Sequence, residues 1–446
     1  MLGLGHRTVR LGVVGCGYVF DHYMATAAAH PALEIAWVWD TDPARLARVS
    51  VFYGLRAARG LDELLSDPSV ELVLNLTPIP AHGEVTRAAL ASGKHVYCEK
   101  PLVTDMDEAH ALFEAAGAAG RILMAAPCNL FSDSVQTLWR AIRDGAVGRP
   151  LLAYAEFDDN PVYLMRPEGW RSRSGAPWPW KHEYEAGCTW EHVGYHLVWL
   201  LALFGPVRRV TAFSKVTVPH KSAVPLDPPD TPDFSVAVLD FESGPVARIT
   251  CSIAAPQDHR MRVIGDEGEI AADTYRHYRS PVRLERFTDL SLNARKSLSV
   301  RRHPMLGRLF GVGGRPLRLV EFPWSDAIRR GSQRRRLAPH KALIAAVKRR
   351  EVGAQDKMLG VALAARAIAE GAPAPLPPDF LLHATELTLG IQAAGPDGDS
   401  FAPRTRFSPL EPLEGAVRGL PDWRRSHGPG LLDRWSRGAI DRLHRH

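Results

Sequence analysis

The stretch of the sequence with the most evident chemistry is GCTWEHVGYH, residues 187–196. It places His192 and His196 four residues apart, so that on a helix both imidazoles share one face, directly behind Glu191. Such a group could bind a metal ion, act as a general base with a helper, or begin a buried helix. A zinc site needs a third ligand, and nothing in the sequence indicates where it would lie, so we expect no metal. An imidazole that titrates near neutral pH suits proton transfer.

A second chemical pattern is Gly15-Cys16-Gly17, which follows the apolar run LGVV and opens a helix-like segment. The first glycine permits a tight turn, and the second lets a pyrophosphate approach the backbone N–H groups of the helix. Phe20 stands where a third small residue is usual. Asp40 ends the next strand-like run, where a carboxylate would bind both ribose hydroxyls and repel a 2′-phosphate; a helix-capping role is the alternative. Because we expect no basic neighbour for a phosphate there, the pattern favours NAD over NADP.

The elements that carry these residues fall into two patterns. From Thr8 to about Ala126, β-rich runs alternate with helix-like segments, as in parallel strands joined by crossover helices. This pattern predicts a doubly wound Rossmann sheet. The runs are VRLGVVG, LEIAWVWD, VELVLNLT, KHVYCE and RILMAA.

Beyond Asn129 the sequence predicts a helix near Ser132–Asp144, a strand near Leu151–Phe157 and a further helix from about Trp190. Three later segments alternate apolar and polar residues around Gly or Ser-Gly turns, which is typical of antiparallel strands. They are RRVTAFSKV, FSVAVLDFESGPVARITCSI and HRMRVIGDEGEIAA. The second half therefore predicts an α+β domain on an open, mostly antiparallel sheet.

These patterns predict three regions: a nucleotide-binding domain over 1–127, a substrate and oligomerisation domain over 128–395, and a Pro/Gly-rich tail over 396–446. Within the second region, 289–336 is rich in arginine and poor in periodic signals, as expected of a solvated loop. The tail ends in a basic amphipathic helix pattern, LLDRWSRGAIDRLHRH, which we expect to dock on protein rather than on a membrane.

Composition excludes several classes of protein. The chain has 446 residues, of which 46% are hydrophobic and 23% charged, as in soluble globular proteins. No apolar run is long enough to cross a bilayer, and the N-terminus lacks a signal-peptide pattern, so we expect a cytoplasmic protein. Five scattered cysteines without a CxxC pair predict buried thiols rather than disulfides. The net charge of +6 gives little support to nucleic-acid binding.

A more specific signal is Glu99-Lys100-Pro101, within LTPIPAHGEVTRAALASGKHVYCEKPL. This segment resembles the glucose-fructose oxidoreductase / inositol 2-dehydrogenase / rhizopine-catabolism family of nicotinamide-dependent sugar and cyclitol oxidoreductases. The resemblance implies that Lys100 contacts the reacting hydroxyl and that the bond before Pro101 is cis. It also implies that His196 is the proton acceptor, and that His192 replaces an aspartate of the family motif.

The resemblance and the glycine pattern together give a set of expected contacts. Besides the groups already named, the loops after the first strands would face the cofactor, with Tyr18, Val19, Thr77, Pro78, His82, Glu99 and Lys100. Substrate contacts would come from Asn129, Trp170 and Arg171 together with the two histidines.

The function expected from these residues is an NAD-dependent oxidoreductase acting on a secondary alcohol of a sugar, sugar derivative or cyclitol. Lys100 would polarise the hydroxyl while an imidazole takes its proton. Two alternatives remain: a glycosidase that uses NAD catalytically, and a sugar or nucleotide sensor of the same fold without chemistry. By resemblance, the open sheet would pack against another subunit in a homodimer or homotetramer.

Overall fold

The first half of the chain forms a five-stranded parallel sheet, as the sequence predicts. The computed structural model describes residues 7–273, 277–292, 312–325, 355–420 and 422–424, and a few single positions between 298 and 307. The strand order is β2-β1-β3-β4-β5, with β1 (Val9–Val14), β2 (Leu33–Trp39), β3 (Leu72–Asn75), β4 (His95–Cys98) and β5 (Leu123–Ala125). The helices are α1 (Phe20–Ala27), α2 (Pro43–Tyr53), α3 (Leu61–Ser66), α4 (His82–Ala91) and α5 (Met106–Ala118).

Local sequence explains these elements. The β3 strand is buried along its whole length, as expected for a parallel sheet covered on both faces. Helix α2 begins at Pro43 because the Asp42 carboxylate accepts hydrogen bonds from the backbone N–H groups of Ala44 and Arg45. The helix ends at Gly54, whose φ of 68° favours glycine. Because all strand pairs of this sheet are parallel, the carboxyl ends of the strands lie at one edge, where ligands of doubly wound sheets bind.

The second half forms a nine-stranded sheet of order β13-β12-β11-β10-β6-β9-β8-β7-β14. Only the β6 and β9 pair is parallel, so the expected open, mostly antiparallel sheet is confirmed. The strands are β6 (Pro150–Asp158), β7 (Val207–Lys215), β8 (Phe234–Phe241), β9 (Val246–Ser252), β10 (Arg260–Gly265), β11 (Gly268–Asp273), β12 (Arg283–Arg286), β13 (Arg315–Pro316) and β14 (Asp399–Phe401).

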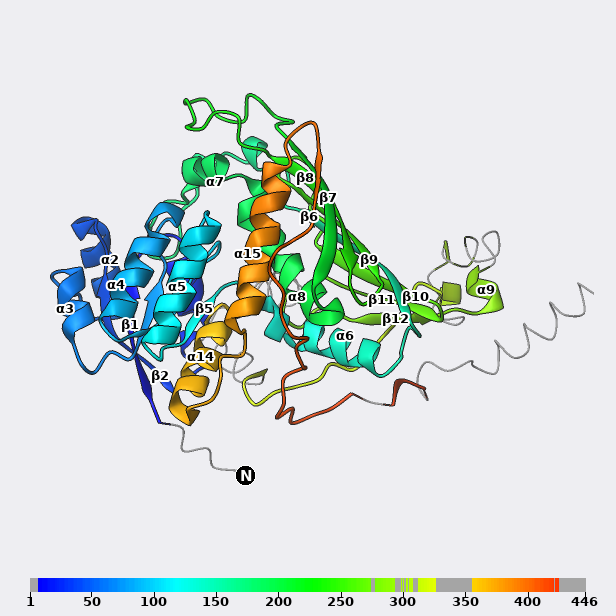
Figure 1. The fold of residues 1–446 in the computed structure, drawn as a ribbon, viewed down its shortest axis with the longest axis horizontal. Helices are drawn as coiled ribbons and strands as arrows, with labels where there is room; N and C mark the ends of the chain where they lie inside the picture. Colours follow the sequence, from blue (N-terminus) through cyan, green and yellow to red (C-terminus); the bar gives the residue numbers. More distant parts are fainter. Residues whose placement is uncertain are drawn as a thin grey trace, which may run out of the picture.

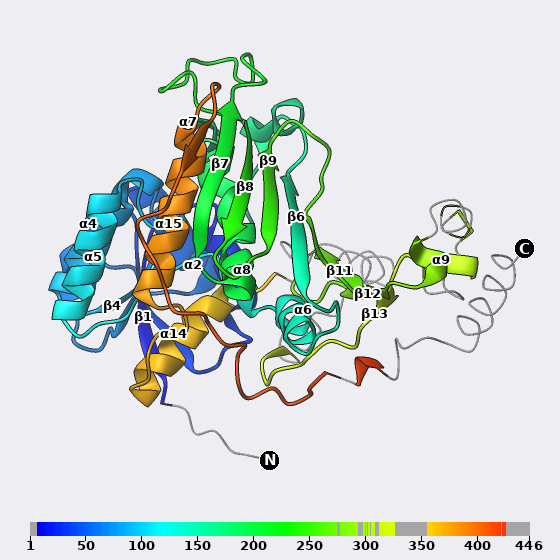
Figure 2. The ribbon, with the colours of Figure 1, turned by 45° about the vertical axis from the view of Figure 1, so that its right-hand side comes forward.

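Four long helices pack on one or both of the two sheets (Figures 1 and 2). Helices α6 (Asp133–Arg143) and α8 (Gly194–Phe204) lie against the large sheet. Helices α14 (Met358–Glu370) and α15 (Pro378–Ala393) come late in the chain, yet α14 packs on β1 and β4, while α15 contacts α5 and β5 as well as β7 and β8. These two helices, which lie in the region predicted as the second domain, therefore also contact the first sheet.

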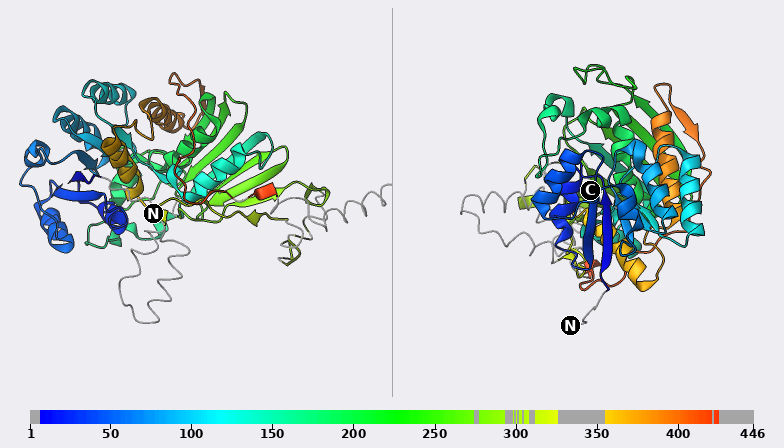
Figure 3. Two further views of the ribbon diagram at one scale, coloured as in Figure 1. Left: turned by 90° about the horizontal axis from the view of Figure 1, so that it is seen from below. Right: turned by 90° about the vertical axis from the view of Figure 1, so that its left-hand side faces the viewer.

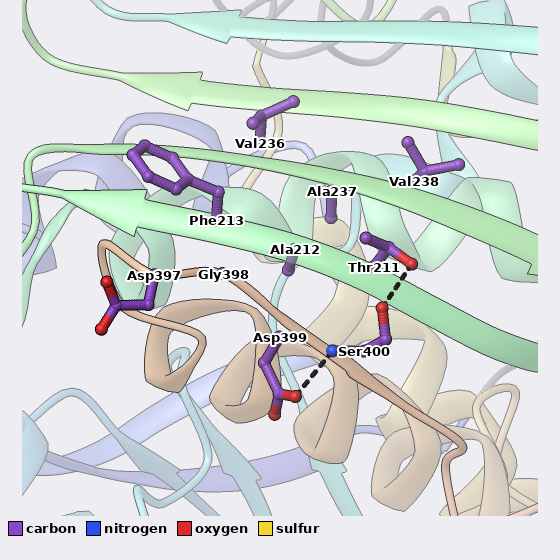
Figure 4. A pocket seen from close by; sticks show the side chains of 10 residues that line it. All are labelled: Thr211, Ala212, Phe213, Val236, Ala237, Val238, Asp397, Gly398, Asp399 and Ser400. Carbon is purple, nitrogen blue, oxygen red and sulfur yellow. Dashed lines mark hydrogen bonds between the residues drawn. The ribbon is translucent and has the colours of Figure 1, made fainter.

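The other face of the large sheet carries no helix among the described elements (Figure 3). Along β7 and β8 the residues alternate: Ala212 and Ala237 point to the buried side, whereas 43% of Val238 is exposed. A hollow at the sheet edge is lined by parts of β7, β8 and the 397–400 segment (Figure 4). In it, the hydroxyls of Thr211 and Ser400 form a hydrogen bond of 2.8 Å. None of the expected site residues lines this hollow.

Three further expectations concern the cysteines, membrane-spanning helices and the arginine-rich segment. All five cysteines are buried and form no disulfide. Within the described residues, no helix is long and apolar enough to span a membrane. The arginine-rich 289–336 segment contributes α9 (Asp289–Leu292) and β13, so its described part is not all loop. Its last residues, 326–336, and the terminal basic helix pattern lie outside the described residues.

Candidate functional site

The GCTWEHVGYH stretch forms a kinked helical segment between the two sheets. Helix α7 (Trp180–Ala186) ends at Gly187, whose φ is 92° and whose missing Cβ would lie 2.5 Å from Thr231 Cγ2. A π turn, η5 (Thr189–Val193), follows and leads into α8. The Gln392 amide spans the kink, donating to the Ala186 carbonyl at 2.9 Å and accepting from the Trp190 N–H at 3.2 Å. The wide turn changes which side chains face the first domain.

Glu191, rather than either histidine, faces the Glu-Lys-Pro segment. Its carboxylate forms an ion pair with the Lys100 ammonium, and the two side chains are 7% and 16% exposed. Burial lowers the pKa of Lys100, but the Glu191 carboxylate outweighs it and holds that pKa well above its usual value. The structure therefore pairs a permanent cation with a buried carboxylate at the boundary of the two sheets.

His196 points to the large sheet and is fully engaged. One ring nitrogen, Nε2, lies 2.7 Å from the Glu156 carbonyl, and Nδ1 accepts from the Trp199 indole N–H at 3.1 Å. The side chain is 1% exposed, and its burial lowers the pKa of His196 to about 3. This bonding is at odds with the proton-acceptor role that the resemblance implies, because both nitrogens already have protein partners.

His192 also faces the large sheet, one helical turn before His196. Its ring stacks on Phe157 of β6 with centroids 4.8 Å apart, and its Nε2 lies 3.9 Å from a carboxylate oxygen of Asp159. His259 approaches the other oxygen of Asp159 at 3.5 Å. His192 therefore lies beside Phe157 and Asp159, whereas the residue paired with Lys100 is Glu191.

Glu99 forms a second charged centre behind Lys100. Its carboxylate accepts from the Tyr23 hydroxyl at 2.9 Å and from the Lys357 ammonium at 2.8 Å, while the Lys100 N–H donates at 3.1 Å. Burial would raise the pKa of Glu99, but the charges of Lys357 and Lys100 outweigh it and hold the pKa at about 2. The bond between Lys100 and Pro101 is cis, as the resemblance implies.

The glycine loop after β1 fits a dinucleotide. Gly15 has a φ of 96°, and a Cβ there would lie 2.6 Å from the Leu76 carbonyl, so a side chain is excluded. The position of a Cβ on Gly17 is open, which leaves the room that a pyrophosphate requires. Gly17, Tyr18 and Val19 are partly exposed at this mouth, whereas Phe20 is buried against Tyr53.

Asp40 lies where a ribose-binding carboxylate is expected, but it has more partners than the sequence indicates. Its oxygens accept from the backbone N–H groups of Cys16 at 2.7 Å and Asp42 at 2.8 Å. The Arg45 guanidinium lies 3.2 Å away. The expectation that no basic group stands beside Asp40 is therefore wrong, because the first turn of α2 brings Arg45 back over the end of β2.

The other expected cofactor residues lie around the β3 and β4 ends. The His82 ring sits between the carbonyls of Thr77 at 2.8 Å and Pro101 at 2.7 Å and is 1% exposed. It holds two loops together rather than presenting a nitrogen to a ligand, which corrects its expected direct contact. Thr77 also donates its hydroxyl to Asn75, and Pro78 precedes the short turn η1 (Ile79–Ala81).

The expected substrate residues are not all brought together. Asn129 is fully buried, and its amide donates to the Tyr195 carbonyl at 2.8 Å, so it fixes α8 instead of lining an opening. Trp170 packs on Trp178 with centroids 4.9 Å apart, beside the aromatic cluster that contains Phe157. Arg171 is exposed and donates to neighbouring carbonyls.

The Trp170 loop reaches the first domain through Ser174. The Ser174 N–H and hydroxyl donate to the Asp21 carboxylate of α1 at 2.8 and 2.9 Å, and the Tyr53 hydroxyl bonds the same carboxylate. This contact places an aromatic loop of the second domain next to the helix that the glycine loop opens.

Sequence reasoning missed the residues that surround Lys100. Glu191 stands inside the quoted motif but was given no role, and Lys357, which pairs with Glu99 next to Lys100, was not a candidate. A carboxylate at position 191 was visible in the sequence as a possible partner for a cation. The π turn that orients its side chain toward Lys100 has no sequence signature. Among the described residues, no group of three or more His, Cys, Asp and Glu side chains is arranged to hold a metal ion.

Comparison with known proteins matches both halves of the chain to models of one protein family. Residues 9–126 match the family described as an oxidoreductase family with an NAD-binding Rossmann fold, and residues 135–271 match the GFO/IDH/MocA C-terminal domain. The chain is 32% identical over 151 residues to inositol 2-dehydrogenase from Acidothermus cellulolyticus, covering 33% of this chain and 44% of that one. The chain spans about half the length of the first curated relatives that it matches, 44% and 52%.

Solved structures share the fold over most of the chain. The WlbA dehydrogenase from Bordetella pertussis, in complex with NADH and UDP-GlcNAcA, gives a TM-score of 0.61 at 19% identity, covering 91% of this chain and 99% of that one. A variant of KijD10, a 3-ketoreductase from Actinomadura kijaniata in complex with TDP-benzene and NADP, gives 0.60 at 18% identity, covering 87% and 98%. With both of its domains matched, the chain belongs to the GFO/IDH/MocA family of oxidoreductases.

Proposed function

We propose that this protein is an NAD-dependent dehydrogenase that oxidises a secondary alcohol of a sugar, sugar derivative or cyclitol, or reduces the corresponding ketone. The observation that carries the proposal is the ion pair of Lys100 and Glu191 at the meeting of the two sheets, beyond the end of β4. The loop around Gly15 and Gly17 supplies a place for the dinucleotide on the same edge.

The roles follow from the charges. Lys100 has three N–H donors and bonds Glu191 with one of them, so another can reach a substrate oxygen. Its positive charge stabilises the alkoxide character that develops when the alcohol loses its proton. Glu191, as the carboxylate partner, accepts that proton through Lys100. The nicotinamide, when bound, exchanges a hydride with the carbinol carbon.

NAD is the proposed cofactor, on the basis of Asp40. Its carboxylate lies at the end of β2 and would repel a 2′-phosphate. Arg45 is the opposing group, because a guanidinium binds phosphate, but here it is paired with Asp40. Solved structures of the same fold are described with NADH and with NADP, so the preferred dinucleotide differs among them. The Asp40 and Arg45 pair is therefore the group to mutate in a test of cofactor preference.

We also propose a homodimer or homotetramer. The helix-free face of the large sheet carries Leu152 and Val238 at 38% and 43% exposure. Between Val238 and Tyr154 lies Arg248, whose guanidinium is 5.0 Å from the centre of the Tyr154 ring. Charged pairs accompany them, among them Arg262 with Glu269 on neighbouring strands. Exposed aliphatic side chains among charged groups that can pair across two copies suit a self-associating surface.

The test combines cofactor binding with a substrate screen. Calorimetric titration with NAD and NADP measures both affinities, and absorbance at the NADH band then follows turnover. The panel includes inositol, D-apiose, 1,5-anhydro-D-fructose and levoglucosan, which occur in the names of relatives, and several nucleotide sugars. We expect NAD to bind and at least one alcohol to yield NADH with the wild type but not with Lys100→Met. Binding of neither dinucleotide would contradict the proposal.

A further inference from the structure

Four charged side chains meet beyond the end of β4, and one of them, Lys357, has no role in the proposed chemistry so far. The Lys100 ammonium pairs with Glu191, and the Lys357 ammonium pairs with Glu99 at 2.8 Å. All four side chains are at most 16% exposed. Each carboxylate therefore has its own lysine, in surroundings where an unpaired charge would be costly.

The chain around Lys357 is fixed against the first sheet. The residue before it, Asp356, is fully buried, and one of its carboxylate oxygens lies 2.8 Å from His30 Nε2. The Cys128 thiol, after β5, donates to the carbonyls of Asp356 and Lys357 at 3.5 and 3.6 Å. These contacts hold the backbone at the start of α14, so that the Lys357 ammonium reaches Glu99.

Glu99 links this lysine to Lys100. One carboxylate oxygen, Oε1, accepts from the Lys357 ammonium and also from the Tyr23 hydroxyl at 2.9 Å. The other oxygen, Oε2, accepts from the backbone N–H of Lys100 at 3.1 Å. The Lys357 ammonium also lies 5.6 Å from the centre of the Tyr23 ring. Three donors thus orient the Glu99 carboxylate, and one of them belongs to the main chain of Lys100.

The charge on Lys357 decides how Lys100 is shared between the two carboxylates. Burial would raise the pKa of Glu99, but the charges of Lys357 and Lys100 hold it at about 2. Without Lys357, an ionised Glu99 would have Lys100 as its remaining cation, and the Lys100 ammonium would be drawn away from Glu191. With Lys357 in place, Glu99 is already neutralised.

We propose that Lys357 is a positioning residue for the reaction: by neutralising Glu99, it keeps the Lys100 ammonium directed at Glu191 and the substrate oxygen. The inference rests on the proposed function and adds a residue that acts through Glu99 and Lys100. It gives the start of α14, late in the chain, a part in arranging the group that follows β4. Because Lys357 acts by its charge, an arginine should replace it in part, whereas an uncharged side chain should not.

Kinetics on an alcohol from the screen tests this role. Lys357→Met should lower kcat by about 10- to 100-fold with a smaller change in KM, since Lys100 is misdirected rather than lost. Lys357→Arg should restore part of the loss. Glu99→Gln/Lys357→Met removes both charges together and should lose less kcat than Lys357→Met alone. The matched control is Arg366→Gln on α14, which breaks only an exposed pair with Glu370 and should keep kcat near the wild type.

The pH dependence gives a signed test. The titratable groups that act on Glu99 are Tyr23, His82, Tyr97, Cys98, Lys100 and Lys357. Loss of the Lys357 charge raises the pKa of Glu99, because burial is then less compensated. As the pH falls, Glu99 in Lys357→Met takes up a proton and no longer attracts Lys100. The ratio of its kcat to that of the wild type should therefore rise, and a ratio that is constant or falls would overturn the inference.

Amine labelling tests the charges without any substrate. Lysines react with acetic anhydride only in their neutral form, so the labelling rate of Lys100, measured by mass spectrometry, falls as its pKa rises. Lys357→Met removes a nearby positive charge and should slow this labelling, whereas Glu99→Gln removes a negative charge and should speed it. Lys181 on α7, 44% exposed, is the internal reference. Faster labelling of Lys100 in Lys357→Met would indicate a loosened structure instead of a lost charge and would contradict the inference.

The two tests separate this inference from the proposed function. If the wild type oxidises an alcohol but Lys357→Met keeps its kcat, the inference fails alone. If the wild type binds no dinucleotide, the proposed function fails, while the labelling rates still decide whether Lys357 acts on Lys100 by its charge.

Discussion

At the scale of single residues, the identity of a side chain indicated the chemistry but not the partner. Lys100 was predicted as the group beside the reacting oxygen, and the structure gives it the buried surroundings that such a role needs. The spacing put the two histidines on one helix face and the resemblance implied their roles, yet both face β6 through Phe157. The reason is that the i, i+4 rule places two side chains on one face without saying which face points to the site.

Asp40 and Arg45 should set the choice of cofactor. In Asp40→Ala the guanidinium of Arg45 keeps only its longer ion pair with Asp42 and becomes more available to a 2′-phosphate, while the repulsion of that phosphate by Asp40 is removed. We expect the ratio of NADP to NAD affinity, measured by calorimetry, to rise at least tenfold, since one charged hydrogen bond contributes about 1.5–3 kcal/mol. Asp62→Ala, which removes an exposed carboxylate on α3 instead, should leave the ratio near that of the wild type. An unchanged ratio in Asp40→Ala would refute this assignment.

His196 should make folding sensitive to acid. Its pKa is lowered to about 3 in the folded protein from an ordinary value of 6.5, because burial disfavours the imidazolium. Below pH 6.5 the unfolded chain therefore takes up a proton that the folded chain does not. The stability is complete above that value and falls as the pH drops toward 3. His196→Gln should flatten this part of the curve of unfolding free energy against pH.

The control for this prediction is His182→Gln, because that side chain is 67% exposed. It should leave the pH dependence as in the wild type. Urea denaturation at several pH values between 4 and 7, about the range in which the two states differ in protonation, measures the effect. Equal slopes for His196→Gln and the wild type would count against the buried, neutral imidazole.

At the scale of elements, long periodic segments were predictable and one short one was not. The five strands of the first sheet and the antiparallel strands of the second follow from apolar runs, alternation and turn residues. The helix predicted from Trp190 begins instead as a π turn, followed by α8 from Gly194. That turn depends on Gln392, 202 positions away from Trp190 in the chain, so no local pattern could predict it.

Gly187 should be essential to the kink. A side chain there would lie 2.5 Å from Thr231 and would adopt a φ of 92°, which L-residues rarely take. We expect Gly187→Ala to lower the free energy of unfolding by about 1–3 kcal/mol, as for other strained backbone positions. Gly60→Ala is the control, because Gly60 has an extended φ of −159° and nothing within 4 Å of its Cβ position. Similar urea midpoints for the two variants would show that the kink tolerates a side chain.

At the scale of the whole molecule, the contacts between the two sheets come from segments distant in sequence. The Lys357 ammonium, at the start of α14, reaches Glu99 beside Lys100, and the Trp170 loop reaches α1 through Ser174. Neither contact could be predicted, because each depends on how two separately patterned units pack. The fold class and the Lys100 position were predictable, whereas the pairing around Lys100 required the tertiary structure.

The exposed sheet face should hold subunits together. Val238→Lys puts a second positive charge beside its cross-strand neighbour Arg248, and we expect it to shift the protein from dimer or tetramer toward monomer at micromolar concentration. Val51→Lys on α2, where 85% of the side chain is exposed, is the matched control. Light scattering measures the mass of both. A monomeric wild type, or dissociation by both variants, would contradict this use of the face.

The central claim is that the chemistry of this protein is carried by the Lys100 and Glu191 pair and not by His196. The measurement that tests it most directly is kcat/KM for Glu191→Gln and His196→Gln, each compared with the wild type, on one alcohol from the screen with saturating NAD. We predict a loss of ~10²–10⁴-fold for Glu191→Gln and a loss within about tenfold for His196→Gln. The opposite order, with His196→Gln inactive and Glu191→Gln close to the wild type, would contradict the account.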